Sequence, residues 1–166
     1  MLKALGFTFL DENGNDVGEG AQALAKVDTV QTQGRLPELK ECRFRIACDV
    51  INPLCGDDGA TFVYGPQKGV TDDMKQPLDM AMAHFADVTA TALGKDLRDV
   101  PGTGAAGGLG FAFLSYLNAR LTPGIDLILD AVKLEDELAD ADIVVTGEGR
   151  LDFQTAMGKA PVGVAR

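Results

Sequence analysis

The sequence of 166 residues contains one histidine, His84, and three cysteines, Cys42, Cys48 and Cys55, with no C-x-x-C pair. A single histidine excludes a metal site built from several histidines of this chain. The position of His84 in a helical pattern favours a surface or packing role over catalysis. An odd number of unpaired-looking cysteines argues against a disulfide framework or a zinc knuckle. We therefore expect three reduced structural thiols.

Long apolar runs and basic runs are also missing. No window approaches the roughly 18 to 20 apolar residues that cross a bilayer, and the first residues carry too short an apolar run for a secretory signal. The net charge is -10 and no run of five or more lysines and arginines occurs. Such a field repels nucleic acid phosphates and anionic lipids. The sequence thus predicts a cytoplasmic protein with neither nucleic acid nor membrane as a partner.

The composition, 46% hydrophobic and 24% charged, is ordinary for a globular protein and allows one domain with a real core. The longest predicted helix covers residues 71–93, with Thr71 as N-cap, two aspartates in its first turn and Gly94 after its end. Pro77 predicts that this helix bends or starts there. The predicted inner face consists of Leu78, Met82, Phe85, Thr89 and Leu93.

Strands and further helices alternate along the rest of the chain. We expect a short strand with Phe7 and Phe9 followed by an Asn-Gly turn, a strand over residues 43–50, and a buried strand in "DIVVTGEG", residues 142–149. Helices are predicted over residues 20–26, 106–121 and, as one or two pieces, 125–141, and a last one opens near residue 158. This order indicates an α/β fold with a layered mixed sheet flanked by helices, formed by residues 1–166 as a single domain.

The stretch "PGTGAAGGLG", residues 101–110, places five glycines before a predicted helix. Each glycine costs roughly 0.5 to 1 kcal/mol relative to alanine in a regular element, so the cluster needs a reason. One reason is close packing of backbone on backbone; the other is binding of an anion by N–H groups at a helix N-terminus. Gly102, Gly104 and Gly107 match G-x-G-x-x-G, although no strand precedes them, which makes them a weak dinucleotide signature.

Polar residues gather in three clusters, each at a strand exit or a helix start, where ligands bind in open α/β sheets. Asp49 and Asn52 follow the first strand, and the glycine stretch is the second cluster. The third, "TGEGRLDFQT", holds Thr146, Glu148, Arg150, Asp152 and Gln154. Carboxylates flanked by glycines suit Mg²⁺, and Arg150, Lys68 and Lys159 suit a phosphate or carboxylate. Alternatively, Asp49, Asn52 and Asp152 only cap turns, and Lys68 lies in a solvated turn.

At these clusters the sequence closely resembles the bacterial glycerate kinases that lack a P-loop. The matching stretches are "ACDVINPLCGDDGATFVYGPQKG", "PGTGAAGGLGF", "PGIDLILDAV" and "DIVVTGEGRLDFQTAMGKAPVGVA", which with "LKALGFTFLDENG" span essentially the whole chain. The resemblance implies ATP-dependent phosphorylation of D-glycerate with Mg²⁺, in the cleft of a two-domain α/β enzyme, with 2-phosphoglycerate favoured over 3-phosphoglycerate. Members of that family are more than twice as long, so we expect this chain to be an incomplete and inactive fragment.

Phosphoryl transfer assigns roles to the clustered residues, because it depends on positioning and charge stabilisation. The predicted catalytic residues are Asp49, Asp152 and the cationic clamp Arg150. Metal ligands are expected among Asp49, Glu148 and Asp152. Binding of substrate and phosphate is assigned to Asn52, Gly104, Gly107, Gly108, Thr146 and Lys68.

Two other functions remain open at this stage. The G-x-G-x-x-G match alone favours a nicotinamide-dependent oxidoreductase domain. Glycines that serve close packing would instead suit a non-catalytic interaction domain. D-glycerate and a nucleotide are the expected small-molecule partners, and a homodimer is possible on the sequence.

Overall fold

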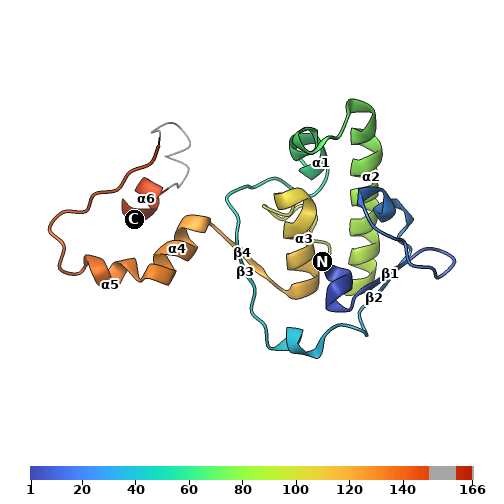
Figure 1. The fold of residues 1–166 in the computed structure, drawn as a ribbon, viewed down its shortest axis with the longest axis horizontal. Coiled ribbons are helices and arrows are strands. Elements are labelled where there is room, and N and C mark those ends of the chain that lie inside the picture. The colour runs from blue at the N-terminus through green and yellow to red at the C-terminus, as the bar shows by residue number, and fades with distance from the viewer. Residues whose placement is uncertain (150–159, 166) are drawn as a thin grey trace. The chain divides into compact units, whose positions relative to one another are not determined.

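The structure is a computed structural model that describes residues 1–149 and 160–165, and it divides the chain into two compact units, residues 1–121 and 122–166. The first unit contains two small sheets and three α-helices, and the second consists of short helices (Figure 1). The predicted α/β class, with small sheets flanked by helices, is confirmed. The prediction that residues 1–166 form a single domain stays a prediction.

The N-terminal segment folds as a turn, a strand and a hairpin-like bend. Helical turn η1 (Leu2–Leu5) precedes strand β1 (Thr8–Leu10), which pairs antiparallel with β2 (Thr29–Gln31). Leu10 and Asp16 bridge across the predicted Asn-Gly turn, and the N–H of Asp11 donates to the carbonyl of Asn15 at 2.8 Å. The helical piece predicted over residues 20–26 is confirmed as η2 (Ala21–Lys26), and a further helical turn, η3 (Pro37–Lys40), follows β2.

Helix α2 (Asp72–Leu93) begins and ends where its sequence signals predict. Thr71 is the N-cap residue, and Gly94 follows the helix with a left-handed φ of 72°. The helix runs through Pro77 and does not start there. Of the predicted inner face, Phe85 and Thr89 are buried, whereas the aliphatic side chains are half-buried. The ring Nε2 of the exposed His84 lies 2.7 Å from the carbonyl oxygen of Val27, which ties α2 to the chain before β2.

The core of the first unit is aromatic and lies between α2, α3 and β1. Phe85 contacts Phe9, Phe111 and Tyr116, with ring centroids 5.7, 6.1 and 6.2 Å apart. The hydroxyl of Tyr116 is 2.7 Å from Oγ1 of Thr89, so the polar ends of these two buried side chains satisfy each other. Burial raises the pKa of Tyr116 to about 12. Edge-to-face and stacked ring contacts of this kind hold α2 and α3 against the first sheet.

Helix α3 (Ala105–Leu117) is shorter than the sequence predicts. Asn118 adopts a left-handed φ of 49° and ends it, and the next residues form β4 (Arg120–Thr122) beside β3 (Arg45–Ala47). Predicting a helix to residue 121 was wrong because pairing with β3 overrides the helical pattern of the "NARL" segment. Strand β3 is also shorter than the predicted strand over residues 43–50. Its side chains are exposed except that of Ile46, which is half-buried. The helices α1 (Ala60–Tyr64) and η4 (Pro66–Lys68) follow β3.

The second unit contains three helices among its described residues: α4 (Gly124–Val132), α5 (Leu134–Leu138) and α6 (Ala160–Ala165). The first two confirm the predicted pair of short helices. The predicted buried strand in residues 142–149 is wrong: Ile143 and Val145 are 83% and 91% exposed, and no strand forms there. A strand needs a hydrogen-bonded neighbour, and the described part of this unit offers none. No helix among the described residues is long and apolar enough to span a membrane.

Candidate functional site

The residues after β3 are organised around Asn52. The Oδ1 of Asn52 accepts a hydrogen bond of 2.6 Å from the hydroxyl of Tyr64, and its Nδ2 donates to the carbonyl of Asp58 at 2.8 Å. The carbonyl of Asn52 accepts a bond of 3.0 Å from the N–H of Gly104. One asparagine thus joins the end of β3, α1 and the glycine stretch. This matches the turn-capping role that was the alternative to ligand binding for Asn52. The bonds of Asn52 hold the chain after β3 in place.

Gly104 serves close backbone packing in the structure. A Cβ at this position would lie 2.3 Å from the carbonyl oxygen of Pro53 and 3.1 Å from that of Asn52. The glycine stretch therefore lies directly on the chain that leaves β3. Thr103, which is completely buried, strengthens the turn because its Oγ1 donates to the carbonyls of Arg98 and Val100 at 2.7 and 2.8 Å.

After Ala105, the three residues Ala106, Gly107 and Gly108 adopt left-handed backbone conformations, with φ values of 52°, 73° and 94°. L-residues pay roughly 1–2 kcal/mol in this region, so two of the three positions suit glycine. Regular helical geometry resumes at Leu109. The N–H groups of Gly107 and Gly108 donate to the carbonyl of Gly104 at 3.2 and 3.4 Å, so this turn is closed by its own backbone hydrogen bonds.

Lys68 lies directly over this turn, although it precedes Gly107 by 39 positions in the sequence. A Cβ built on Gly107 would lie 2.9 Å from the Nζ of Lys68. The lysine is exposed, and among the described residues its ammonium group has no ion-pair partner. The structure thus brings together three residues of the predicted binding set: Lys68, Gly107 and Gly108.

An apolar hollow of about 580 Å³ opens beside the same turn. Gly107 and Gly108 border it together with apolar side chains from other segments, among them Leu54, Met82 and Phe85. A cation, a glycine turn and an apolar hollow therefore adjoin one another. This combination suits a ligand that carries both anionic oxygens and an apolar ring, because pockets for such ligands are largely apolar with a few placed polar groups.

Asp79 is a buried carboxylate that the sequence reasoning missed. It projects from α2 and accepts the N–H of Gly56 with both oxygens, at 3.1 and 3.0 Å. Burial raises the pKa of Asp79 above its usual value, and the nearby charge of Asp57 adds to this, while the bond from Gly56 lowers it. Its position beside Leu78 on the predicted inner face was the available signal, since a carboxylate there needs a buried donor. Asp79 fixes the loop of residues 55–59 against α2.

All three cysteines are free thiols, as predicted. Cys42 is exposed, whereas Cys55 is half-buried. Burial and the neighbouring charge of Asp79 raise the pKa of Cys55 to about 12. Only the thiolate attacks electrophiles, so Cys55 is unsuited to serve as a nucleophile near pH 7.

We expect iodoacetamide at pH 8 to alkylate Cys42 first and Cys55 last, because the Cys55 thiol stays protonated. Mass spectrometry after timed pulses measures the modified fraction of each cysteine-containing peptide. In urea the three thiols should react at similar rates, since the burial is lost. Alkylation of Cys55 in the folded protein as fast as that of Cys42 would contradict the protonated state.

The remaining predicted residues lie in different units or outside the described residues. Asp49 is exposed after β3 in the first unit, and Thr146 and Glu148 lie in the second unit, exposed and half-buried respectively. Arg150, Asp152, Gln154 and Lys159 lie outside the described residues. Within residues 1–149 and 160–165, no three His, Cys, Asp or Glu side chains are grouped to hold a metal ion. The metal ligands Asp49, Glu148 and Asp152 therefore stay predictions.

Comparison with known proteins identifies relatives along the whole chain. The model of the "Glycerate kinase family" matches residues 1–166. The chain is 49% identical to a glycerate kinase of Bacillus subtilis (strain 168), with 100% of this chain and 44% of the relative covered. It is 46% identical to a glycerate 2-kinase of Escherichia coli (strain K12), covering 99% of this chain and 43% of the relative.

A solved structure agrees with these relatives. The crystal structure of a candidate glycerate kinase 2 from Salmonella typhimurium LT2 superimposes with a TM-score of 0.90 at 45% identity, over 99% of this chain and 44% of that chain. The chain thus spans less than half the length of the curated relatives it matches.

Proposed function

Because the chain belongs to the glycerate kinase family, we propose that the intact natural protein transfers the γ-phosphoryl group of ATP to D-glycerate. The relatives' names specify glycerate as the substrate, and one of them specifies the 2-kinase reaction. We extend this to the present protein, with 2-phosphoglycerate as the product. The 166 residues then form a domain, or a domain and part of a second, of a longer two-domain enzyme.

The observation that carries the proposal is the position of Lys68 over the left-handed turn at Gly107. A cation beside a glycine turn fits a phosphate group, because the ammonium offsets its charge and a glycine lets its oxygens approach the chain. A side chain at Gly107 would occupy that space. The adjoining apolar hollow bordered by Leu54 and Met82 accommodates the base of a nucleotide.

Lys68 and the turn would act by stabilising charge that develops on the phosphate oxygens during transfer, since phosphoryl transfer depends on positioning and electrostatics. Asn52 keeps this turn against the residues that leave β3 through its bond with Gly104. Asp49 follows β3 and remains our candidate for the base that accepts the proton of the glycerate hydroxyl. Asp152 remains the other candidate for the base or for a metal ligand, Arg150 for the cationic clamp, and Thr146 for binding substrate and phosphate.

Mg²⁺, when bound with the nucleotide, would neutralise charge on the phosphate oxygens. The described residues do not by themselves group into a metal site. The ion would therefore bind together with the nucleotide phosphates.

A phosphorylation assay with the intact natural protein, ATP, Mg²⁺ and D-glycerate tests the proposal, and phosphorus NMR of the product identifies the phosphorylated hydroxyl. We expect turnover that requires all three components and a signal from 2-phosphoglycerate. Product from the 3-hydroxyl would overturn the regiochemistry alone. Saturable binding of NADH with no binding of ATP would instead favour the oxidoreductase alternative.

A further inference from the structure

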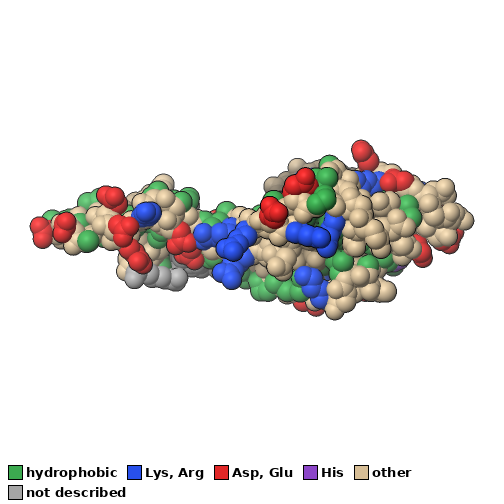
Figure 2. All heavy atoms as spheres, turned by 90° about the horizontal axis from the view of Figure 1, so that it is seen from below, with side chains coloured by type: hydrophobic (Ala, Val, Ile, Leu, Met, Phe, Trp, Pro, Cys, Tyr) green, Lys and Arg blue, Asp and Glu red, His purple; other side chains and the backbone are tan. Residues whose placement is uncertain are grey.

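A second group of cations lines a groove at the other end of β3. The groove has a volume of about 500 Å³. Among the residues that the structure describes, five cationic side chains and no aspartate or glutamate line it; the five are Arg35, Lys40, Arg43, Arg45 and Arg120. Lys and Arg side chains also gather on the face of the molecule shown in Figure 2. We call the groove lined by these five cationic residues the basic groove.

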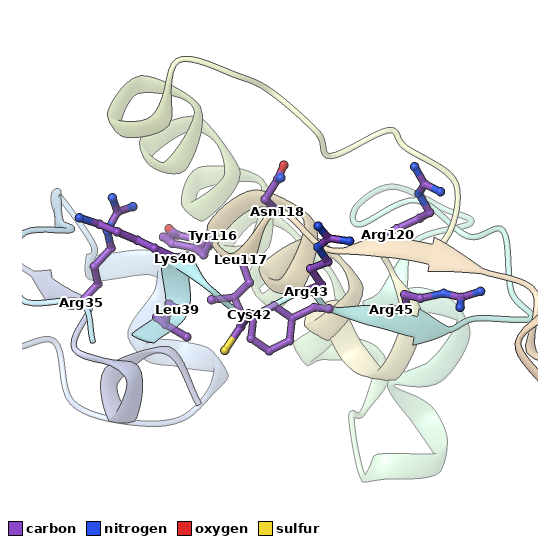
Figure 3. A pocket seen from close by; sticks show the side chains of 11 residues that line it. Arg35, Leu39, Lys40, Cys42, Arg43, Arg45, Tyr116, Leu117, Asn118 and Arg120 are labelled. Atoms are coloured by element: carbon purple, nitrogen blue, oxygen red, sulfur yellow. The ribbon is translucent and has the colours of Figure 1, made fainter. Parts of the chain in front are cut away.

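Strand pairing creates the basic groove. The N–H of Arg120 donates to the carbonyl of Phe44 at 2.9 Å, which holds β4 beside the segment that enters β3. Arg43 and Arg45 are two residues apart, so in an extended chain they project to the same side. Figure 3 shows these arginines with Arg120 on the neighbouring strand, and Arg35 and Lys40 arriving from the segment before β3.

The charge of the groove contrasts with the rest of the chain. The protein has 25 acidic and 15 basic residues, yet five of those 15 line one groove without an acid. Elsewhere arginine is neutralised: Arg98 pairs with Asp96 at 2.8 Å and with Asp87. Among the described residues, Arg35, Lys40, Arg43 and Arg120 form no ion pair. Like charges in one groove repel one another, and a bound anion removes that cost.

The groove is also separate from the candidate site described above. Arg35, Arg43 and Arg45 precede or begin β3 and Arg120 begins β4. Asp49 and Asn52 instead follow β3. None of its lining residues belongs to the turn at Gly107 or to the loop that carries Lys68. A ligand in the groove would therefore not occupy the phosphate position of the proposed reaction.

We propose that the basic groove binds a small anion carrying several phosphate groups. Guanidinium groups recognise phosphate oxygens through paired hydrogen bonds, which favours arginine for this ligand class. The groove volume lies in the range of sites for small ligands. The side chain of Asn118, at the end of α3, adds a polar group to its wall. The partial negative charge of that helix end is offset by the cations.

Titration calorimetry of inorganic tripolyphosphate with the intact natural protein tests this proposal. We expect the double variant Arg43→Gln/Arg120→Gln to bind tripolyphosphate at least tenfold more weakly than the unmodified protein. The single variant Lys26→Gln, which removes an exposed cation outside the groove, should bind normally. Lys68→Gln should also retain this binding, which separates the groove from the proposed catalytic site.

The exposed pair Arg35→Gln/Lys40→Gln provides a second variant that leaves both strands unaltered, in case the first affects folding. Circular dichroism monitors the fold of each variant. Equal affinity in both groove variants and the unmodified protein would overturn the proposal, as would loss of binding in Lys68→Gln alone. Binding of a single-stranded oligonucleotide without binding of tripolyphosphate would overturn the assignment to a small anion.

Discussion

Replacing Lys68 by glutamine in the intact natural protein is expected to lower kcat for glycerate phosphorylation about 100-fold, or about 2.7 kcal/mol. The ammonium group lies over the turn at Gly107, where a Cβ would be 2.9 Å from its Nζ. Glutamine keeps a polar side chain but removes the charge that would stabilise the phosphate oxygens. A coupled assay at saturating ATP and glycerate measures kcat. Because Lys68 is exposed, the free energy of unfolding should change little.

Two further variants make this result specific. Lys68→Arg keeps the positive charge and should recover part of the lost activity, although the guanidinium differs in shape from the ammonium. Lys26→Gln removes an exposed cation away from the turn and should leave kcat unchanged. If Lys68→Gln turned over like the unmodified protein, Lys68 would be a solvated loop residue, as its position in "GPQKG" alone would suggest.

Local signals in the sequence were sufficient for the helices whose ends are encoded nearby. Thr71 and Gly94 flank α2 as predicted, and the "DENGN" turn forms beside β1. In each case the residues that decide the structure lie within a few positions of one another. Capping and turn chemistry are local, so a single sequence reveals them.

Elements that depend on distant partners were predicted poorly. Helix α3 stops at Leu117 because β4 pairs with β3, a contact between segments more than 70 residues apart. The apolar run at Ile143 has the composition of a strand, but no described segment of its unit pairs with it. A hydrophobic pattern indicates only that a segment is compatible with a strand. The strand forms when a neighbouring segment pairs with it through backbone hydrogen bonds.

The candidate site shows the same division. The glycine stretch was recognisable from sequence. The structure supports the packing explanation at Gly104, which lies against the chain after β3, whereas anion binding at Gly107, beneath Lys68, stays a prediction. Which glycine does which depended on the segments that approach them, and these come from "INPL" and "GPQKG". The buried Asp79 was missed for the same reason, since its partner Gly56 is 23 residues away.

The Gly104→Ala substitution is expected to lower the free energy of unfolding by about 2–4 kcal/mol. The φ of −73° at this position suits alanine, so the backbone conformation is not the obstacle. The added Cβ would lie 2.3 Å from the carbonyl oxygen of Pro53, which belongs to the backbone and has no rotamer to change. The turn must move away, and the 3.0 Å bond from the N–H of Gly104 to Asn52 is lost. Urea unfolding of the intact natural protein, followed by circular dichroism, measures the loss.

Gly107→Ala and Gly147→Ala separate this steric effect from the general effect of adding a methyl group. At Gly147 no atom of the described residues lies within 4 Å of the new Cβ, so the free energy of unfolding should change by no more than about 0.5 kcal/mol. Gly107→Ala costs about 1–2 kcal/mol for its left-handed φ of 73° and meets only the movable end of Lys68. It should therefore reduce kinase activity more than stability, whereas Gly104→Ala should reduce both. Equal free energies of unfolding for Gly104→Ala and Gly147→Ala would show that the chain after β3 moves aside without loss of stability. In that case Asn52 would not hold the turn in place.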